Sequence, residues 1–291
     1  MDTHLHADDN VYDSLAEAAG GEERWAFGTG FDDPLAGVDT TVPDGVDAAV
    51  LARLCLALGD DALILSQRLA GWVSNAHELE DEVALANVAL DLLGQARLLL
   101  SRAAQADPSI RPPRAPEHLP DEDALAYFRD EEEFTNVRLA ERDDAGDFAR
   151  CIARLLVLVT WRFAVMSRLA AVPDPVLAAI AAKAVVEMTY HREYAAGWVV
   201  RLGDGTDLSH ARTQDAVEWL WPDLEELFVA DGGREEFFAA LRPVLTAATI
   251  VEPQRRSDES VGGRMGRHTD DLEPLLAGLQ DFARANPDAS W

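Results

Sequence analysis

The stretch LGDDALILSQRLAGWVSNAHELEDEVALANVALDLLGQARLLL, residues 58–100, decides the fold of this 291-residue chain. On both sides of a polar turn, SNAHELEDE, apolar residues recur at spacings of three and four, which is the pattern of an amphipathic helix. No proline interrupts the pattern before Pro108, so it predicts two long helices at about 48–73 and 80–106. The acidic residues of the turn would lie in the first turn of the second helix, where they suit its dipole.

Two further long helices follow after a crossover segment. The residues 146–171 and 174–202 repeat the same apolar spacing, and Pro175 stands in the first turn of the later helix. Between the two pairs, a proline-rich loop leads into DEDALAYFRDEEEFTNVRLAE, which predicts one or two short helices. Two helical hairpins joined by a longer crossover are typical of a ferritin-like four-helix bundle. We therefore expect an all-α chain, with additional C-terminal helices at about 209–229, 233–249 and 270–284.

The first 45 residues differ from the rest of the chain. They are rich in Gly, Asp, Thr and Pro and have no helical period, so we expect residues 1–45 to form an acidic, flexible arm. The ferritin-like domain would then occupy 46–291. The start MDTHLHADDNVYDS lacks the apolar segment of a signal peptide, and no apolar run reaches the length of a membrane span. These features predict a soluble, cytoplasmic protein.

Charge and cysteine content exclude several classes of partner. The chain has 53 Asp and Glu against 25 Lys and Arg, a net charge of −28, and such a surface repels nucleic acid and anionic membranes. The two cysteines, Cys55 and Cys151, stand in apolar runs without metal-ligand spacing. We expect both to be buried thiols, neither disulfide-bonded nor bound to a metal.

A ferritin-like bundle raises the question of a di-iron centre. Such a centre takes a Glu from each of two helices and a Glu-x-x-His pair from each of the other two. The first helix has no Asp, Glu or His from Ala62 to Val73, and the third has none from Phe148 to Val172. In the fourth helix, Met188 stands three residues before His191. Because two helices supply no ligand, we expect no di-iron site in this chain.

Four polar residues remain in the second and fourth helices, each pair one turn apart: Asp91 with Gln95, and Glu187 with His191. Glu187 also has Lys183 one turn back, and it could instead pair with His191. We interpret the four as a buried hydrogen-bond network that fills an empty metal cavity. A catalytic acid–base pair and a mononuclear metal site formed by Asp91, Glu187 and His191 are the alternatives.

Long motifs in the chain resemble the C-type subunit of the bacterial phenylacetyl-CoA epoxidases. They are residues 58–100, FRDEEEFTN at 128–136, KAVVEMTYHREYAAGWVVRLGDGT at 183–206, GGRMGRHT at 262–269 and the C-terminal Trp291. The resemblance implies membership of a complex in which a related A-type subunit holds the di-iron centre and epoxidises the aromatic ring of phenylacetyl-CoA. Oxygen and electrons would reach that di-iron partner with the help of a flavin and iron–sulfur reductase.

The resemblance also implies a role for this chain. The C-type subunit is similar in fold to the di-iron partner but non-catalytic, pairs with it and supports it structurally. We therefore expect no catalytic residue and no cofactor here, the di-iron partner and the other epoxidase components as binding partners, and self-association when the chain is alone. The positions that match ligands of the di-iron partner hold one retained ligand, His191, and four replacements, Ala62, Leu92, Gln95 and Met188.

The motif FRDEEEFTN lies in the crossover, where an insertion can reach a partner. Its charged residues, Arg129 to Glu133, would ordinarily form a solvated face. A contact with the di-iron partner or with CoA through Glu133, Phe134, Thr135 and Asn136 is a further hypothesis. Any basic lining for the CoA phosphates would come mainly from the partner, because this chain is so acidic.

Two other functions stay open from the sequence. One is a stand-alone metal oxidase or oxygenase of the ferritin superfamily that uses Asp91, Glu187 and His191. The other is a general scaffold unrelated to phenylacetate.

Overall fold

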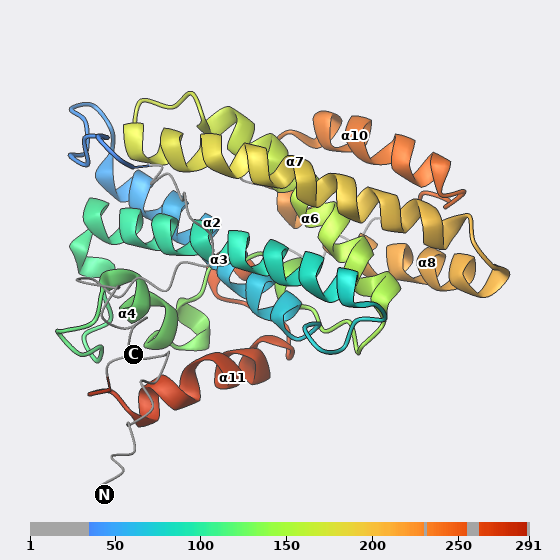
Figure 1. Ribbon diagram of the computed structural model, residues 1–291. Helices are drawn as coiled ribbons and strands as arrows, with labels where there is room; N and C mark the ends of the chain where they lie inside the picture. Colours follow the sequence, from blue (N-terminus) through green and yellow to red (C-terminus); the bar gives the residue numbers. More distant parts are fainter. Residues whose placement is uncertain (1–34, 230–231, 255–261, 290–291) are drawn as a thin grey trace, which may run out of the picture. The chain divides into compact units, whose positions relative to one another are not determined.

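The computed structural model describes residues 35–229, 232–254 and 262–289. The chain divides into two units, Met1–Ala36 and Gly37–Trp291. Within the described residues every regular element is a helix, which confirms the predicted all-α class (Figure 1). All of these helices belong to the second unit.

The four long helices lie where the sequence predicted them, with ends within three residues of the expected positions. They are α2 (Ala48–Ala70), α3 (Leu79–Ala106), α6 (Phe148–Leu169) and α7 (Pro175–Gly203). The shorter elements are η1 (Pro108–Ile110), α4 (Asp121–Tyr127), η2 (Glu131–Glu133), α5 (Arg138–Glu141), α8 (Asp207–Leu220), η3 (Trp221–Asp223), α9 (Glu226–Val229), α10 (Arg234–Ala247), η4 (Gly263–Met265) and α11 (Leu272–Ala285).

Aspartates begin three of the four long helices. Asp47, Asp147 and Asp174 each stand directly before a helix, and the side chain of each accepts a hydrogen bond from a backbone N–H of the first turn, at 2.8–3.0 Å. Such caps satisfy N–H groups that have no partner within the helix. Pro175 follows the last of these caps and occupies the first turn of α7, as predicted.

The long helices form two hairpins, α2 with α3 and α6 with α7, and α3 also packs against α7. Gly59 of α2 lies where a Cβ atom would come within 2.9 Å of the Leu100 side chain of α3, so a residue without a side chain allows this close crossing. Both cysteines are free thiols in this core, which confirms their predicted burial, and burial raises the pKa of each to about 12.

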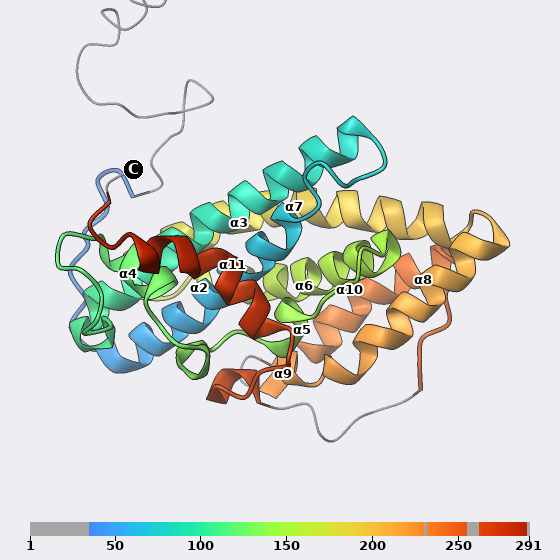
Figure 2. The ribbon, with the colours of Figure 1, turned by 90° about the horizontal axis from the view of Figure 1, so that it is seen from below.

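The remaining helices cover the bundle. Seen from below, α11 crosses α2 and α4, while α8 and α10 lie along the α6–α7 hairpin (Figure 2). The prediction of one helix over 209–229 was wrong. Pro222 lacks the N–H that would continue the helix, and α8 ends at Leu220, followed by the separate η3 and α9.

The predicted arm falls mainly on residues 1–34, outside the described residues, and its flexibility stays a prediction. Residues 37–45 belong to the helical unit. The carbonyl of Thr40 accepts a hydrogen bond from Arg102 of α3 at 2.6 Å, and Arg102 is itself buried in an ion pair with Asp174. The end of the predicted arm therefore lies against the bundle.

Candidate functional site in the bundle interior

The structure brings the four predicted polar side chains together across α3 and α7. Asp91 Oδ2 lies 2.9 Å from His191 Nε2, and Gln95 donates from Nε2 to Glu187 Oε2 at 2.8 Å. His191 and Gln95 are buried, whereas the Asp91 side chain is 38% exposed. We call these four residues the interior cluster; each of its hydrogen bonds joins two helices.

The partners within the cluster differ from one alternative that the sequence left open. Glu187 and His191 are one helical turn apart, but they do not pair with each other, and each contacts a residue of α3 instead. Lys183 does form an ion pair with Glu187, as the spacing indicated. The acidic groups of the cluster are therefore already engaged, Asp91 with an imidazole and Glu187 with an ammonium and an amide.

Sequence reasoning missed the central residue of this interior, Arg162 of α6. Its Nε donates to Gln95 Oε1 at 3.0 Å, and its Nη1 donates to the carbonyl of Leu58 in α2, also at 3.0 Å. Burial lowers the pKa of Arg162 to about 10, and the charge of Asp61 opposes that effect. The guanidinium is thus still charged at neutral pH. A single arginine inside the apolar run LLVLVTWRFAVM was the available signal.

Two polar atoms of this interior have no protein partner within the described residues. They are Nη2 of Arg162 and Nδ1 of His191, both fully buried. Because Nε2 of His191 contacts a carboxylate, the geometry favours the tautomer with the proton on Nε2, which leaves Nδ1 as an acceptor.

The residues present do not fit a di-iron centre. Within the described ranges, no three His, Cys, Asp or Glu side chains are grouped so as to hold a metal ion. Ala62, Leu92 and Met188, at positions that the resemblance matches to ligands, are fully buried and offer neither carboxylate nor imidazole. The charge of Arg162 in the same interior also repels a metal cation. The mononuclear alternative built on Asp91, Glu187 and His191 has no geometric support in this arrangement.

A second polar network lies beside the interior, and the sequence reasoning missed its acidic members. Asp60 of α2 is fully buried and pairs through both carboxylate oxygens with Arg129 of the crossover, one of the contacts measuring 3.0 Å. The same carboxylate accepts hydrogen bonds from N and Oγ1 of Thr135, each at 2.9 Å. Arg129, expected on a solvated face, is therefore buried, because it neutralises Asp60.

The neighbouring Asp61 repeats this arrangement with a distant part of the chain. Arg264 of η4 binds both carboxylate oxygens, at 2.9 and 2.8 Å, and also donates to the carbonyl of Thr135 at 2.8 Å. The N–H of Val137 donates to Asp61 at 2.8 Å. Two adjacent aspartates of α2 thus hold the crossover and the C-terminal segment on the bundle.

These contacts correct part of the crossover hypothesis. Phe134 and Asn136 are fully buried, and Asn136 donates to Glu141 at 2.8 Å, so neither side chain can touch a partner or CoA in this fold. Thr135 is bound to Asp60. Glu133, half-exposed and paired with Arg114, keeps an outward position, and Thr135 is partly exposed. For Glu133 and Thr135 the partner contact stays a prediction.

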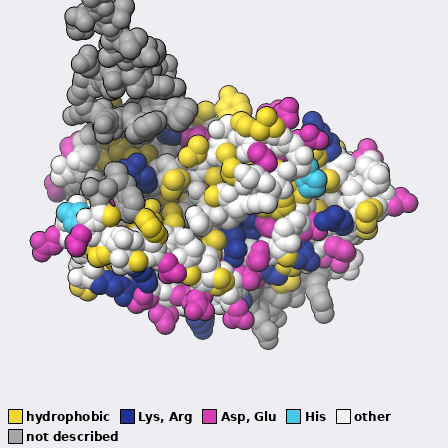
Figure 3. Space-filling view, turned by 60° about the horizontal axis from the view of Figure 1, so that its bottom comes forward, with side chains coloured by type: hydrophobic (Ala, Val, Ile, Leu, Met, Phe, Trp, Pro, Cys, Tyr) yellow, Lys and Arg dark blue, Asp and Glu magenta, His cyan; other side chains and the backbone are white. Residues whose placement is uncertain are grey.

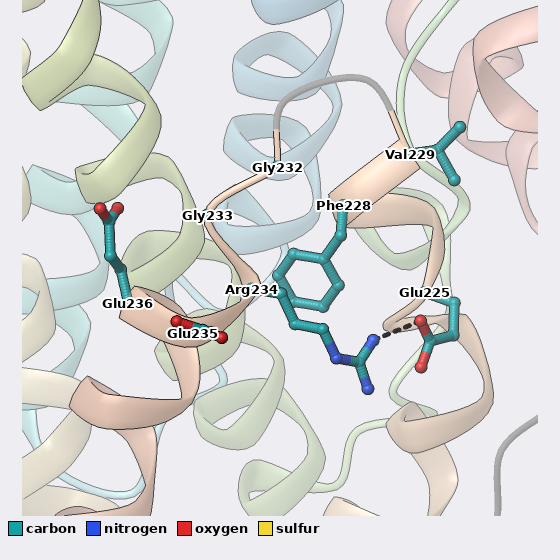
Figure 4. A pocket seen from close by; sticks show the side chains of 8 residues that line it. All are labelled: Glu225, Phe228, Val229, Gly232, Gly233, Arg234, Glu235 and Glu236. Carbon is teal, nitrogen blue, oxygen red and sulfur yellow. Dashed lines mark hydrogen bonds and ion pairs between the residues drawn. The ribbon is translucent and has the colours of Figure 1, made fainter.

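A surface hollow beside α9 and α10 offers no free cationic group among its described lining residues. It has a volume of about 570 Å³ and is lined by residues between Glu225 and Glu236. Figure 4 shows the guanidinium of Arg234 turned toward Glu225, with which it forms an ion pair, while Glu235 and Glu236 line the other side. The carboxylates outnumber the single arginine of the lining, so the hollow does not favour the phosphates of CoA.

Helix α3 is apolar beyond what its packing requires. Its length and composition would allow it to cross a membrane, but core helices of soluble proteins meet the same criterion, so this is weak evidence for a membrane span. Less than half of its most apolar stretch is buried. Its buried Gln95 and Arg102 instead bond to α6 and to the cap of α7. On the face drawn in Figure 3, exposed hydrophobic side chains form patches among acidic and basic side chains. Exposed apolar residues of the two helices that carry the interior cluster include Val83, Leu90 and Leu93 of α3 and Val186 and Tyr190 of α7.

The helix arrangement and the interior define a ferritin-like bundle in which an arginine and an amide lie among the remaining polar groups. The chain belongs to the phenylacetic acid catabolic protein family, whose model matches residues 38–291. It is 42% identical over 257 residues to the C subunit of 1,2-phenylacetyl-CoA epoxidase from Escherichia coli (strain K12). The match covers 83% of this chain and 99% of the relative, and it confirms the resemblance seen in the sequence motifs.

Proposed function

We propose that this chain is a non-catalytic structural subunit of a phenylacetyl-CoA epoxidase, which pairs with the di-iron partner, supports it and holds no cofactor of its own. The observation that carries the proposal is the hydrogen-bonded chain from Arg162 through Gln95 to Glu187 in the bundle interior. The similarity to the C subunit of an epoxidase supports the assignment to that complex. The other components, including the reductase, are its further partners.

The interior cluster supports a structural role more than a catalytic one. A general acid or base needs a proton-accepting or proton-donating atom that a substrate can reach. Here His191 is buried, Glu187 is bound by Lys183 and Gln95, and Asp91 is bound by His191. Insertion of oxygen also needs a metal or another cofactor, for which the described residues of this interior offer no ligand set.

The surface that supports pairing is the apolar face of α3 and α7. Leu90 is 63% exposed and Tyr190 is 68% exposed, and they adjoin Asp91 and His191 in sequence, where the two helices are bonded to each other. Exposed aromatic and aliphatic residues on neighbouring helices are typical of interface cores. We propose the di-iron partner as the preferred occupant, because two chains that each carry −28 repel one another, and we expect a second copy there only when the di-iron partner is absent.

The test is to purify this chain alone and together with the di-iron partner, and to measure bound iron and turnover of phenylacetyl-CoA in each preparation. We expect a stable complex of the two chains, iron only where the di-iron partner is present, and turnover only in that complex. Stoichiometric iron in this chain alone would favour the stand-alone metal oxidase. A folded chain that ignores the di-iron partner would favour an unrelated scaffold.

A further inference from the structure

We propose that the guanidinium of Arg162 supplies the positive charge that metal ions supply in metal-binding bundles of this type, and so lets this chain fold without a metal. The inference concerns the isolated chain and does not rest on its pairing with the di-iron partner. It follows from the position of Arg162, from the charges around it and from the helices that it joins.

Arg162 contacts a position that holds a metal ligand in the di-iron partner, as the resemblance implies. Its Nε bonds to Gln95, and the resemblance matches Gln95 to a metal ligand. Its Nη1 donates a hydrogen bond to the carbonyl of Leu58. Gln95 in turn donates a hydrogen bond to Glu187. One side chain of α6 thus joins α2 and α3 directly and α7 through one amide. A metal ion held by ligands from all four helices joins them in the same manner.

The charges around Arg162 favour its own positive charge. Asp61 of α2 and Glu187 of α7 act on it as negative charges, and Arg264 acts as a positive one. Arg264 is bound to Asp61, and Lys183, on the same helix as Glu187, is bound to that carboxylate from its outer, less buried side. Each carboxylate thus has one cationic partner, and Arg162 adds a further positive charge in a buried region where unbalanced charge is costly.

The planar shape of the guanidinium also matters. Nε and Nη1 point to an amide oxygen and a backbone carbonyl on different helices, at 3.0 Å each. A lysine at this position would keep the charge but lose the fixed fork of donors. The charge of Arg162 and the geometry of its donors are therefore two separate properties, and substitution can test them one at a time.

The experiment is a double-mutant cycle on the full chain, with thermal unfolding as the readout. Arg162→Met removes the charge at similar volume, and Glu187→Gln removes the opposite charge while keeping an oxygen for Gln95. We expect Arg162→Met to lower the unfolding midpoint by several degrees. In the Arg162→Met background, Glu187→Gln should cost less than in the natural chain, because the carboxylate then no longer gains from the charge of Arg162. Additive effects would overturn the proposal.

A matched surface pair provides the control. Arg242 and Glu252 form an exposed two-bond ion pair, so the cycle of Arg242→Met and Glu252→Gln should give little coupling. If Arg162→Met does not fold, Arg162→Lys and Arg162→Gln replace it. Lysine should then keep the chain more stable than glutamine, and equal stability of the two would overturn the role of charge.

Metal addition gives a second, independent readout. The unfolding midpoint of the natural chain should be the same with a chelator and with added Mn²⁺, Fe²⁺ or Zn²⁺. A midpoint that rises with one of these ions, or falls with the chelator, would mean that the folded chain is stabilised by a metal, and the proposal would fail. Neither measurement depends on the di-iron partner, so its outcome is distinct from that of the pairing experiment.

Discussion

His268 and Glu141 form a fully buried pair in which the imidazole is held at both nitrogens. Nδ1 of His268 lies 2.8 Å from the Glu141 carboxylate, and Nε2 lies 3.0 Å from the carbonyl of Phe134. Two acceptors require two N–H donors, which only the imidazolium has. Burial acts to lower the pKa of His268, but the hydrogen bond and the charge of Glu141 outweigh it and raise that pKa above its ordinary value.

The pair predicts a pH dependence of stability. Because the pKa of His268 is higher in the folded chain, its contribution is complete below the unfolded value, about 6.5, and is lost as the pH rises through the folded value. His268→Gln should cost on the order of 3 kcal/mol at pH 6, and less at alkaline pH. Urea unfolding of both proteins across this range measures the difference. His118→Gln, at an exposed site, should show no such trend.

Removing the charge of Glu187 should affect stability and leave turnover unchanged. Glu187→Gln keeps the shape of the side chain, so its cost should be about 1–3 kcal/mol in the free energy of unfolding. Turnover of the assembled epoxidase, corrected for the amount of intact complex, should stay close to normal. A loss of about 10²–10⁴ in rate from a stable complex would instead mark Glu187 as an acid or base. Glu193→Gln, exposed on the same helix, is the control.

Loss of the Asp60 carboxylate should be among the most damaging single changes. Asp60→Asn leaves the buried Arg129 without its counter-charge and weakens the acceptor for Thr135, so we expect a cost of about 3–5 kcal/mol. Denaturant unfolding followed by circular dichroism measures it. Asp204→Asn, at the exposed end of α7, should change stability by less than about 0.5 kcal/mol. Equal effects of the two changes would contradict a structural role for the Asp60 network.

Charge on the apolar face of α3 and α7 should weaken the pairing with the di-iron partner. Leu90→Asp and Tyr190→Asp are exposed changes that leave the core intact, and each should lower the affinity for that partner about tenfold or more. Leu208→Asp, equally exposed on α8, should leave it unchanged. Affinity measured by surface-immobilised binding distinguishes them, and three equal affinities would move the interface elsewhere.

The two cysteines should resist alkylation while the chain is folded. Burial raises the pKa of Cys55 and Cys151 to about 12, so almost no reactive thiolate forms at pH 8, and the sulfur atoms are also covered. Iodoacetamide followed by mass spectrometry should modify neither thiol in the folded chain and both after unfolding in guanidinium. Rapid modification of either in the folded state would show local opening of α2 or α6.

The local spacing of residues was enough to predict the four long helices and four of the polar residues between them. The apolar spacing located α2, α3, α6 and α7, and the one-turn spacing selected Asp91, Gln95, Glu187 and His191. These signals lie within a few residues of each other along the chain. The break after Leu220 was also local, in Pro222, but the apolar period around it masked that signal.

The residues that the sequence did not reveal are those whose interaction partners lie far away along the chain. Arg162 is the only charged side chain in a long apolar run, and its partners lie on two other helices. Asp60 lies inside a buried helix face, and its partner Arg129 is 69 residues away. A buried charge in an amphipathic helix indicates that some partner exists, but it does not identify which one.

The ion pair between Asp61 and Arg264 can form only late in the synthesis of this protein. The two residues are 203 positions apart, so at elongation rates of about 5–20 residues per second Arg264 leaves the ribosome roughly 10–40 s after Asp61. The α2–α3 hairpin is local and can form early. Until Arg264 has been made, however, the Asp61 carboxylate of this hairpin lacks its arginine partner. Such long-range closure slows folding. Asp61 of α2 therefore receives its arginine partner only after almost all of the described chain has been made, and a chain that ends before Arg264 leaves that buried carboxylate without it.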